Sequence, residues 1–155
     1  MLSLKSVEYS VGEFKLKADF KIPRLSKVAL IGPSGAGKST LLSLISGFLK
    51  PNSGSIIIDN EDVTTKLSNQ RRVTTIFQDG NLFPHLTVKK NISLGLRPDL
   101  RLNSAQQSVL DYAIDRVGLT DLVDRKPGSL SGGQQSRVSL ARALVRDCPL
   151  LLLDE

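Results

Sequence analysis

Residues 32–40 have the sequence Gly-Pro-Ser-Gly-Ala-Gly-Lys-Ser-Thr, and this stretch decides the fold class. It fits the pattern G-x-x-x-x-G-K-[ST], which forms a phosphate-binding loop when a strand precedes it and a helix follows it. The short apolar run at residues 27–31 predicts the strand, and the apolar residues of 38–48 recur at helical spacing. The glycines let successive backbone N–H groups point inward, and the helix N-terminus adds positive potential. The sequence therefore predicts a strand, loop and helix that bind phosphate.

Two side chains of this loop carry separate roles. Lys38 is expected to neutralise the β and γ phosphates of a nucleotide, and the Ser39 hydroxyl to hold a Mg²⁺ ion that bridges the same phosphates. The alternative is a glycine-rich turn without chemical meaning, and the further motifs argue against it. The residues expected to bind the nucleotide here are Gly32, Pro33, Ser34, Gly35, Ala36, Gly37, Lys38, Ser39 and Thr40.

The last six residues, Leu-Leu-Leu-Leu-Asp-Glu, predict a strand that ends in two carboxylates. An all-apolar run at 150–153 is typical of a strand buried on both faces of a parallel sheet. Ligands of open α/β sheets bind at such strand ends. Asp154 suits the Mg²⁺ shell, and Glu155 could orient and deprotonate an attacking water. Without the phosphate loop, an ordinary exposed strand end would be the better interpretation.

Residues 130–134, Leu-Ser-Gly-Gly-Gln, predict a second anion-binding helix start. A single ATP needs only one such site. The second is explained if two copies of the chain meet head to tail, each offering this helix start to the γ-phosphate held by the other. The alternative is a helix N-cap followed by loop glycines.

The remaining pattern alternates strands and helices. A helix is expected from the small-residue loop at 129–133 to about residue 146, and another with Ser104 as its N-cap. The further strands are expected at residues 2–8, 14–22, 55–59 and 73–77, and helical segments at 87–123.

Composition restricts the classes of function. The 155 residues carry a net charge of +6, but the Lys and Arg residues are scattered and aromatic residues are few, so a nucleic-acid partner is not expected. The single cysteine, Cys148, excludes an internal disulfide and is expected to be a buried, inert thiol. No apolar run approaches the ~20 residues that span a bilayer, and no secretory signal is evident, which predicts a cytoplasmic location.

Four segments in sequence order, GPSGAGKST, the glutamine of IFQD, LSGGQ and LLLLDE, resemble the motifs of ATP-binding-cassette ATPases. The resemblance covers essentially the whole chain. It implies an α/β fold of the P-loop NTPase class, with an antiparallel β subdomain and a helical insert, that binds ATP and Mg²⁺. The nucleotide-binding core would comprise about residues 1–83 and 134–155, and the helical insert about 84–133.

The resemblance also assigns roles to single residues. Gln78 would link the Mg²⁺ and the attacking water to the helical insert, which makes it both a catalytic and a metal-site residue. Ser131, Gly133 and Gln134 would contact the ATP of the partner copy. Tyr9 would stack on adenine, although Phe14 is a nearby competitor and either ring could belong to the core.

A finer resemblance is carried by LLSLISGFLKPNSG, FQDGNLFPHLTVKKNISLGLRPDLRLNSAQQ and LARALVRDCPLLLLDE, which are similar to the ATPase subunits of bacterial thiamine importers. It implies that about residues 78–88 contact the permease in the membrane, with His85 inside this stretch. It further implies a peripheral location on the cytoplasmic face of the inner membrane, and an external solute-binding protein that is engaged indirectly. The substrate would be thiamine or a similar small solute.

Departures from the family pattern matter as well. Gln135 and Ser136 follow LSGGQ where relatives usually show Arg and a polar residue, and Leu25 stands where glycine is common. By the family fold, a strand after Glu155 would lie between the strands at 27–31 and 150–153, so we expect an incomplete central sheet. Residues 1–155 alone are then expected to hydrolyse no ATP and to lack a stable fold.

Three alternatives stay open. The chain could be a nucleotide-binding module without turnover, or an importer cassette for another substrate. A soluble cassette of the DNA-repair or translation type is disfavoured, because LFPHLTV resembles importer subunits and no basic groove is evident.

Overall fold

The structure is a computed structural model that describes residues 1–77 and 81–154. The chain divides into two compact units. The sheet unit comprises Met1–Thr74 and Cys148–Asp154, and the helical unit comprises Thr75–Asp147. The helix that follows LSGGQ falls in the helical unit, whereas the expected boundaries place it with the nucleotide-binding core.

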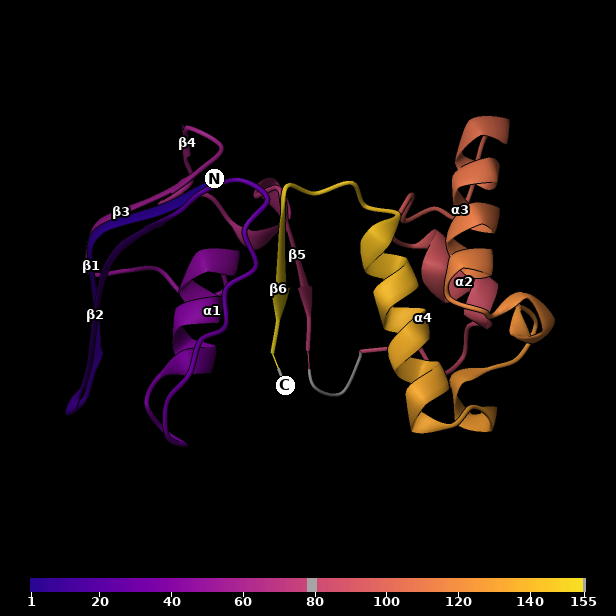
Figure 1. Cartoon of the computed structure of the whole chain (residues 1–155), viewed down its shortest axis with the longest axis horizontal. Helices are drawn as coiled ribbons and strands as arrows, with labels where there is room; N and C mark the ends of the chain where they lie inside the picture. The colour runs from indigo at the N-terminus through magenta and orange to yellow at the C-terminus, as the bar shows by residue number, and fades with distance from the viewer. Residues whose placement is uncertain (78–80, 155) are drawn as a thin grey trace. The chain divides into compact units, whose positions relative to one another are not determined.

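An antiparallel sheet forms one layer of the sheet unit (Figure 1). Its strands are β1 (Leu2–Val11), β2 (Phe14–Ile22), β3 (Ser53–Ile58) and β4 (Glu61–Asp62), in the order β2-β1-β3-β4. Along β2 the apolar side chains are half-buried and the residues between them are exposed, because successive strand residues face opposite sides of the sheet. The predicted bounds of this strand are confirmed.

Helix α1 (Lys38–Ser46) packs its apolar side chains into the core of the sheet unit. Leu44 is fully buried, and Leu41 and Ile45 are nearly so. They meet the inward side chains of β1 and β3, of which Leu4, Val7 and Ile56 are the most deeply buried. The helix that starts at the phosphate loop is therefore held to the sheet by hydrophobic burial.

The apolar run at residues 27–31 does not form a strand, which corrects the prediction. Val28 and Ile31 are exposed, with 63% and 89% of the maximal accessible surface of each residue. Strands β5 (Val73–Ile76) and β6 (Leu150–Leu153) form a two-stranded sheet and run in the same direction (Figure 1). An apolar run becomes a strand only when a neighbouring strand satisfies its backbone groups, and none of the described residues does so for 27–31.

The bounds of β6 match the prediction, but its burial does not. Only Leu152 is buried, while Leu151 and Leu153 are exposed. A strand of a covered parallel sheet would bury both faces. Cys148, just before β6, is half-buried rather than buried.

A buried arginine, Arg71, caps the C-terminal end of α1. Its Nη1 donates to the carbonyl oxygens of Leu44 and Ile45 at 2.7 and 2.9 Å. Its Nε and Nη2 donate to the carbonyls of Lys66 and Thr64 at 2.9 and 3.2 Å. Cationic donors at a helix C-terminus satisfy its free carbonyls and complement its dipole, so Arg71 holds the far end of the helix that begins at the phosphate loop.

Replacing Arg71 with alanine is expected to lower the free energy of unfolding by about 3 kcal/mol or more, because several buried carbonyls lose their donor. Urea denaturation followed by circular dichroism measures the change, in a protein extended to the full length of the cassettes that the sequence resembles. The matched control is alanine at the exposed neighbour Arg72, which should leave the midpoint nearly unchanged. Equal midpoints for the two variants would contradict the capping role.

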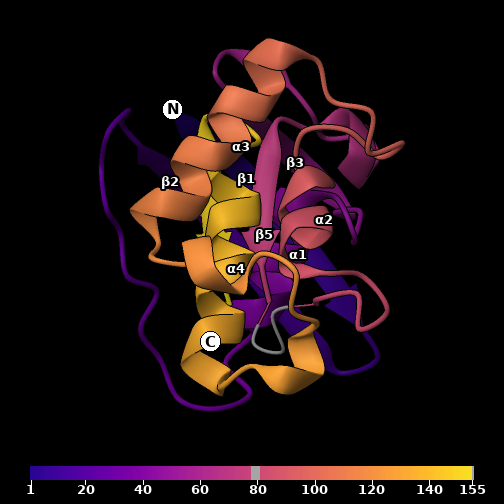
Figure 2. The same ribbon diagram turned by 90° about the vertical axis from the view of Figure 1, so that its right-hand side faces the viewer.

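The helical unit consists of α2 (Val88–Ser93), α3 (Ser104–Arg116) and α4 (Gly132–Leu144), with short 3-10 turns at Thr120–Leu122 and Pro127–Ser129 (Figure 2). A second core, separate from that of the sheet unit, includes Val88, Ile92, Leu110 and Val138. The N-cap of α3 is Asn103 and not Ser104, which corrects the prediction. The Asn103 side chain accepts a hydrogen bond from the Gln106 N–H, and the Gln106 side chain accepts one from the Asn103 N–H.

Candidate phosphate-binding site

The phosphate loop ends at the first turn of α1 in the sheet unit. Gly37 is the N-cap of the helix with φ of 89°, a left-handed conformation that favours glycine. The ammonium group of Lys38 donates to the carbonyl oxygens of Gly32 and Pro33, both at 2.8 Å. The lysine thus closes the loop on itself and holds its charge beside the backbone that the sequence predicts to cradle phosphate.

Phe14 lies directly against this loop. A Cβ atom placed on Gly37 would lie 2.8 Å from the Phe14 ring and 3.1 Å from Leu16. Any larger residue at position 37 would therefore clash as well as strain the backbone. The start of β2 therefore supports the phosphate loop from one side. The sequence suggests Phe14 only as an alternative to Tyr9 for stacking on adenine, and this supporting role was missed.

Tyr9 lies in β1 opposite Leu16 of β2 and packs, partly buried, against the core of the sheet unit. This placement agrees with the core alternative for Tyr9. Stacking on adenine stays a prediction.

Ser39 and Asp154 come together although they are 115 positions apart in the chain. The Ser39 hydroxyl donates to Oδ1 of Asp154 at 3.0 Å. Hydroxyl and carboxylate oxygens are the ligands that Mg²⁺ prefers, usually with phosphate oxygens and water completing the shell. No cluster of three or more His, Cys, Asp and Glu residues occurs in the described part of the chain, so an ion here would depend on such outside ligands.

Two predicted catalytic residues, Gln78 and Glu155, lie outside the described residues. Their roles stay predictions from the sequence.

The LSGGQ segment starts α4 in the helical unit. Ser131 is the N-cap, and its hydroxyl accepts from the backbone N–H of Gln134 at 3.3 Å. The Gln134 side chain accepts from the Ser131 N–H at 2.8 Å, which completes a capping box. The N-cap alternative is therefore present in the structure.

The two glycines of this segment have no structural requirement among the described residues. A Cβ atom on Gly132 or Gly133 would meet no atom within 4 Å, and neither residue has positive φ. Glycine within the first helical turn costs stability relative to alanine. Open space at a helix N-terminus is suited to close approach by an anion.

Gln135, which departs from the family pattern, has a local role. Its side-chain amide donates to the carbonyls of Pro127 and Leu130 at 3.1 and 3.3 Å. It ties the start of α4 to the preceding turn.

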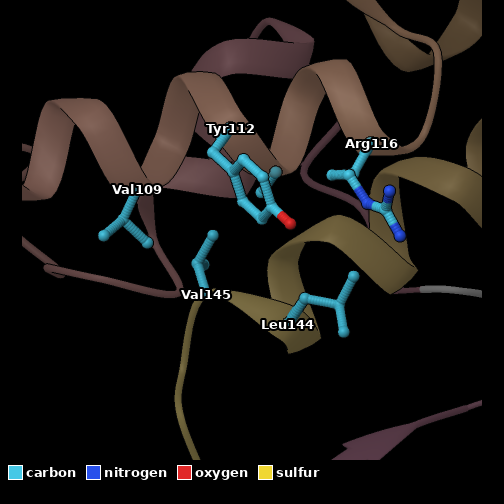
Figure 3. Close-up of a pocket in the computed structure, with 6 residues that line it drawn as sticks. Val109, Tyr112, Arg116, Leu144 and Val145 are labelled. Carbon is cyan, nitrogen blue, oxygen red and sulfur yellow. The ribbon is translucent and has the colours of Figure 1, made fainter.

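A cavity of about 330 Å³ lies elsewhere in the helical unit, between α3 and the C-terminal end of α4 (Figure 3). Mostly apolar side chains line it: Val109, Tyr112, Ala113, Arg116, Leu144 and Val145. None of them belongs to the phosphate loop or to LSGGQ.

The sequence profile of the ABC transporter family matches residues 16–155, which include the phosphate loop, LSGGQ and Asp154. The chain belongs to the ABC transporter family. Thiamine import ATP-binding protein ThiQ of Shigella sonnei is 50% identical over all 155 residues, and the chain covers 67% of that protein. The same-named protein of Yersinia pestis is 49% identical, with 66% of its length covered. The chain thus spans about two thirds of the length of these relatives.

Solved structures of ABC cassettes share the fold. A dimeric cassette in a post-hydrolysis state, bound to ADP and Pi, is 32% identical with a TM-score of 0.83, covering all of this chain and 74% of that one. A nucleotide-free cassette from an ABC transporter is 27% identical with a TM-score of 0.85, covering 99% of this chain and 68% of the other. The family and fold expected from the sequence motifs are confirmed.

Proposed function

We propose that this protein is the ATP-hydrolysing subunit of an ABC importer that drives uptake of thiamine, or a similar small solute, through a membrane permease. The observation that carries the proposal is the 50% identity to thiamine import ATP-binding proteins over the whole of this chain. The phosphate loop supplies groups suited to binding ATP. The Lys38 ammonium lies against the loop backbone, and the Ser39 hydroxyl donates to Asp154.

Within this site, Lys38 exchanges the Gly32 and Pro33 carbonyls for phosphate oxygens when ATP binds. Ser39 and Asp154 would hold a Mg²⁺ ion, which would neutralise charge on the phosphates. Glu155 would accept a proton from the attacking water. Gln78 would orient that water and would be a further ligand of the ion.

The functional unit is a head-to-tail pair of cassettes. In it, the start of α4, with Ser131, Gly133 and Gln134, approaches the γ-phosphate bound by the partner copy. The open space around Gly132 and Gly133 supports this arrangement. Two solved structures of one ABC cassette that resembles this chain are also dimeric.

Gly133→Ala separates this function from folding. Alanine fits the open space and is a better helix former, so the free energy of unfolding is expected to stay equal or to rise by about 0.5–1 kcal/mol. ATP-driven pairing should be lost, because the methyl group occupies the space that the partner's phosphate would enter. Light scattering with and without MgATP measures pairing.

The matched control for this variant is Gly128→Ala, another glycine with open space around it but outside α4. It should pair like the wild type. Normal pairing of the Gly133→Ala variant would show that the start of α4 does not face the partner's nucleotide.

The protein is placed on the cytoplasmic face of the bacterial inner membrane, bound to its permease through about residues 78–88, with a solute-binding protein acting from outside. No described helix combines the length and apolar character required to cross a membrane.

Reconstitution tests the proposed function. The protein is combined with its permease and solute-binding protein in liposomes, and phosphate release is measured with thiamine and with a panel of other small solutes. Stimulation by thiamine supports the proposal, while stimulation by another solute alone would identify an importer for that substrate. Nucleotide binding without phosphate release would favour the module without turnover.

A further inference from the structure

A buried asparagine fixes the loop of residues 81–87, which precedes α2 in the helical unit. Asn91 of α2 is fully buried. Its Oδ1 accepts from the Phe83 N–H at 2.8 Å, and its Nδ2 lies 3.1, 3.1 and 3.0 Å from the carbonyl oxygens of Phe83, Leu86 and Thr87. A single amide group thus satisfies backbone groups along most of the loop. Such bonds are costly to break away from water.

A second side chain ties the other end of the loop to α4. Nη1 of Arg142 donates to the carbonyl oxygen of Asn81 at 2.9 Å. Asn81 itself has φ of 44°, an uncommon conformation for a residue other than glycine, which needs support from its surroundings.

Helices α2 and α4 pack closely, side by side (Figures 1 and 2). A Cβ atom on Gly95, just after α2, would lie 2.4 Å from the carbonyl oxygen of Arg142. Val88 and Ile92 of α2 share a fully buried core with Val138 of α4. Loop, α2 and α4 therefore form one packed body, which contains LSGGQ at its far end.

The loop presents aromatic rings outward from this body. Phe83, Pro84 and His85 are exposed, whereas Leu82 packs against the core of the helical unit. The rings of Phe83 and His85 meet edge to face, with centroids 6.0 Å apart and an interplanar angle of 76°. The exposed side is thus a small, ordered contact surface.

We propose that Asn91 and Arg142 are positioning residues that make the loop of residues 81–87 a rigid extension of α4, so that contact of the permease with Phe83 and His85 is transmitted to LSGGQ. The inference rests on the proposed function, because it needs a permease as the partner. These two side chains, which belong neither to the phosphate loop nor to LSGGQ, set the coupling between permease contact and ATPase activity. A loop that moved independently of α4 would absorb the permease contact instead of passing it on.

The experiment has two arms and two variants, Asn91→Ala and Arg142→Met, made in a protein of the full length of the thiamine import relatives. In the first arm, hydrogen–deuterium exchange of the purified proteins should show amides of residues 81–87 exchanging about tenfold faster than in the wild type, with α3 unchanged. In the second arm, the basal ATPase rate should stay within about twofold of the wild type, while stimulation by the reconstituted permease falls about 5- to 10-fold.

Two comparisons distinguish coupling from general damage. Arg142→Lys keeps a donor for the Asn81 carbonyl and should recover most of the stimulation that Arg142→Met loses. Gln107→Ala removes an amide that donates to Asp111, one turn along the same helix, and it should behave like the wild type in both arms. Because Arg142 is part-exposed, its variants stay informative if Asn91→Ala fails to fold.

Unchanged amide exchange in residues 81–87 would show that Asn91 and Arg142 do not fix this loop. Faster exchange together with full stimulation by the permease would show that the fixed loop has no part in coupling. Absence of stimulation in the wild type would instead overturn the proposed function, and the exchange arm would still decide whether Asn91 and Arg142 hold the loop.

Discussion

Replacing Lys38 with alanine is expected to weaken binding of MgATP about 100-fold. The ammonium group lies at the mouth of the phosphate loop, 2.8 Å from the carbonyls of Gly32 and Pro33, and would turn to the β and γ phosphates. Charge-assisted hydrogen bonds of this kind contribute about 3 kcal/mol together, which corresponds to roughly that change in affinity. Isothermal titration calorimetry measures the dissociation constant directly.

The matched control is Lys50→Ala, which removes an exposed lysine beyond the end of α1. Its affinity for MgATP should equal that of the wild type. If Lys38→Ala also binds normally, phosphate neutralisation must be assigned to another residue. A thermal melt of both variants verifies that the loss reflects binding rather than unfolding.

Glu155→Gln is expected to abolish turnover while nucleotide binding persists. The amide keeps the size and polarity of the carboxylate but cannot accept a proton, and general-base catalysis contributes about 100- to 10,000-fold to rate. The kcat for phosphate release should fall by such a factor, with the affinity for ATP nearly unchanged. A protein of the full length of the thiamine import relatives is the suitable material, because residues 1–155 span about two thirds of that length.

Asp147→Asn provides the control for this carboxylate-to-amide change. Asp147 is exposed in the turn before β6 and has φ of 45°, a conformation that asparagine adopts well. Its kcat should match that of the wild type. A Glu155→Gln variant with nearly normal kcat would show that the base lies elsewhere.

Much of the local structure could be predicted from the sequence. The bounds of β2 and β6 follow from alternation and from an unbroken apolar run, and α1 begins at Lys38, as the loop pattern requires. These features depend on residues close together in the chain. The N-cap of α3 was missed by one residue, because Asn103 and Ser104 are both good caps and only the backbone geometry distinguishes them.

Contacts between distant segments were not predictable in this way. The sequence marks Phe14 as apolar, but not that its ring closes on Gly37. Asn91 and Arg71 are single polar residues whose side chains bond backbone groups, and such partners have no sequence signature. For Asn91 the one available signal was its spacing, three residues after Val88 and directly before Ile92, which places it on the apolar side of a short helix.

The sequence by itself determined the family, the phosphate loop and the order of the motifs, because these depend on residue types at fixed short spacings. The tertiary structure decided which distant groups meet. It placed Ser39 beside Asp154, bonded the loop of residues 81–87 to α2 and α4, and left residues 27–31 without the strand that their apolar pattern predicts. The physical reason is the same in each case. Hydrogen bonds and burial depend on a partner brought near by folding, and a local pattern specifies the need for a partner but not its identity.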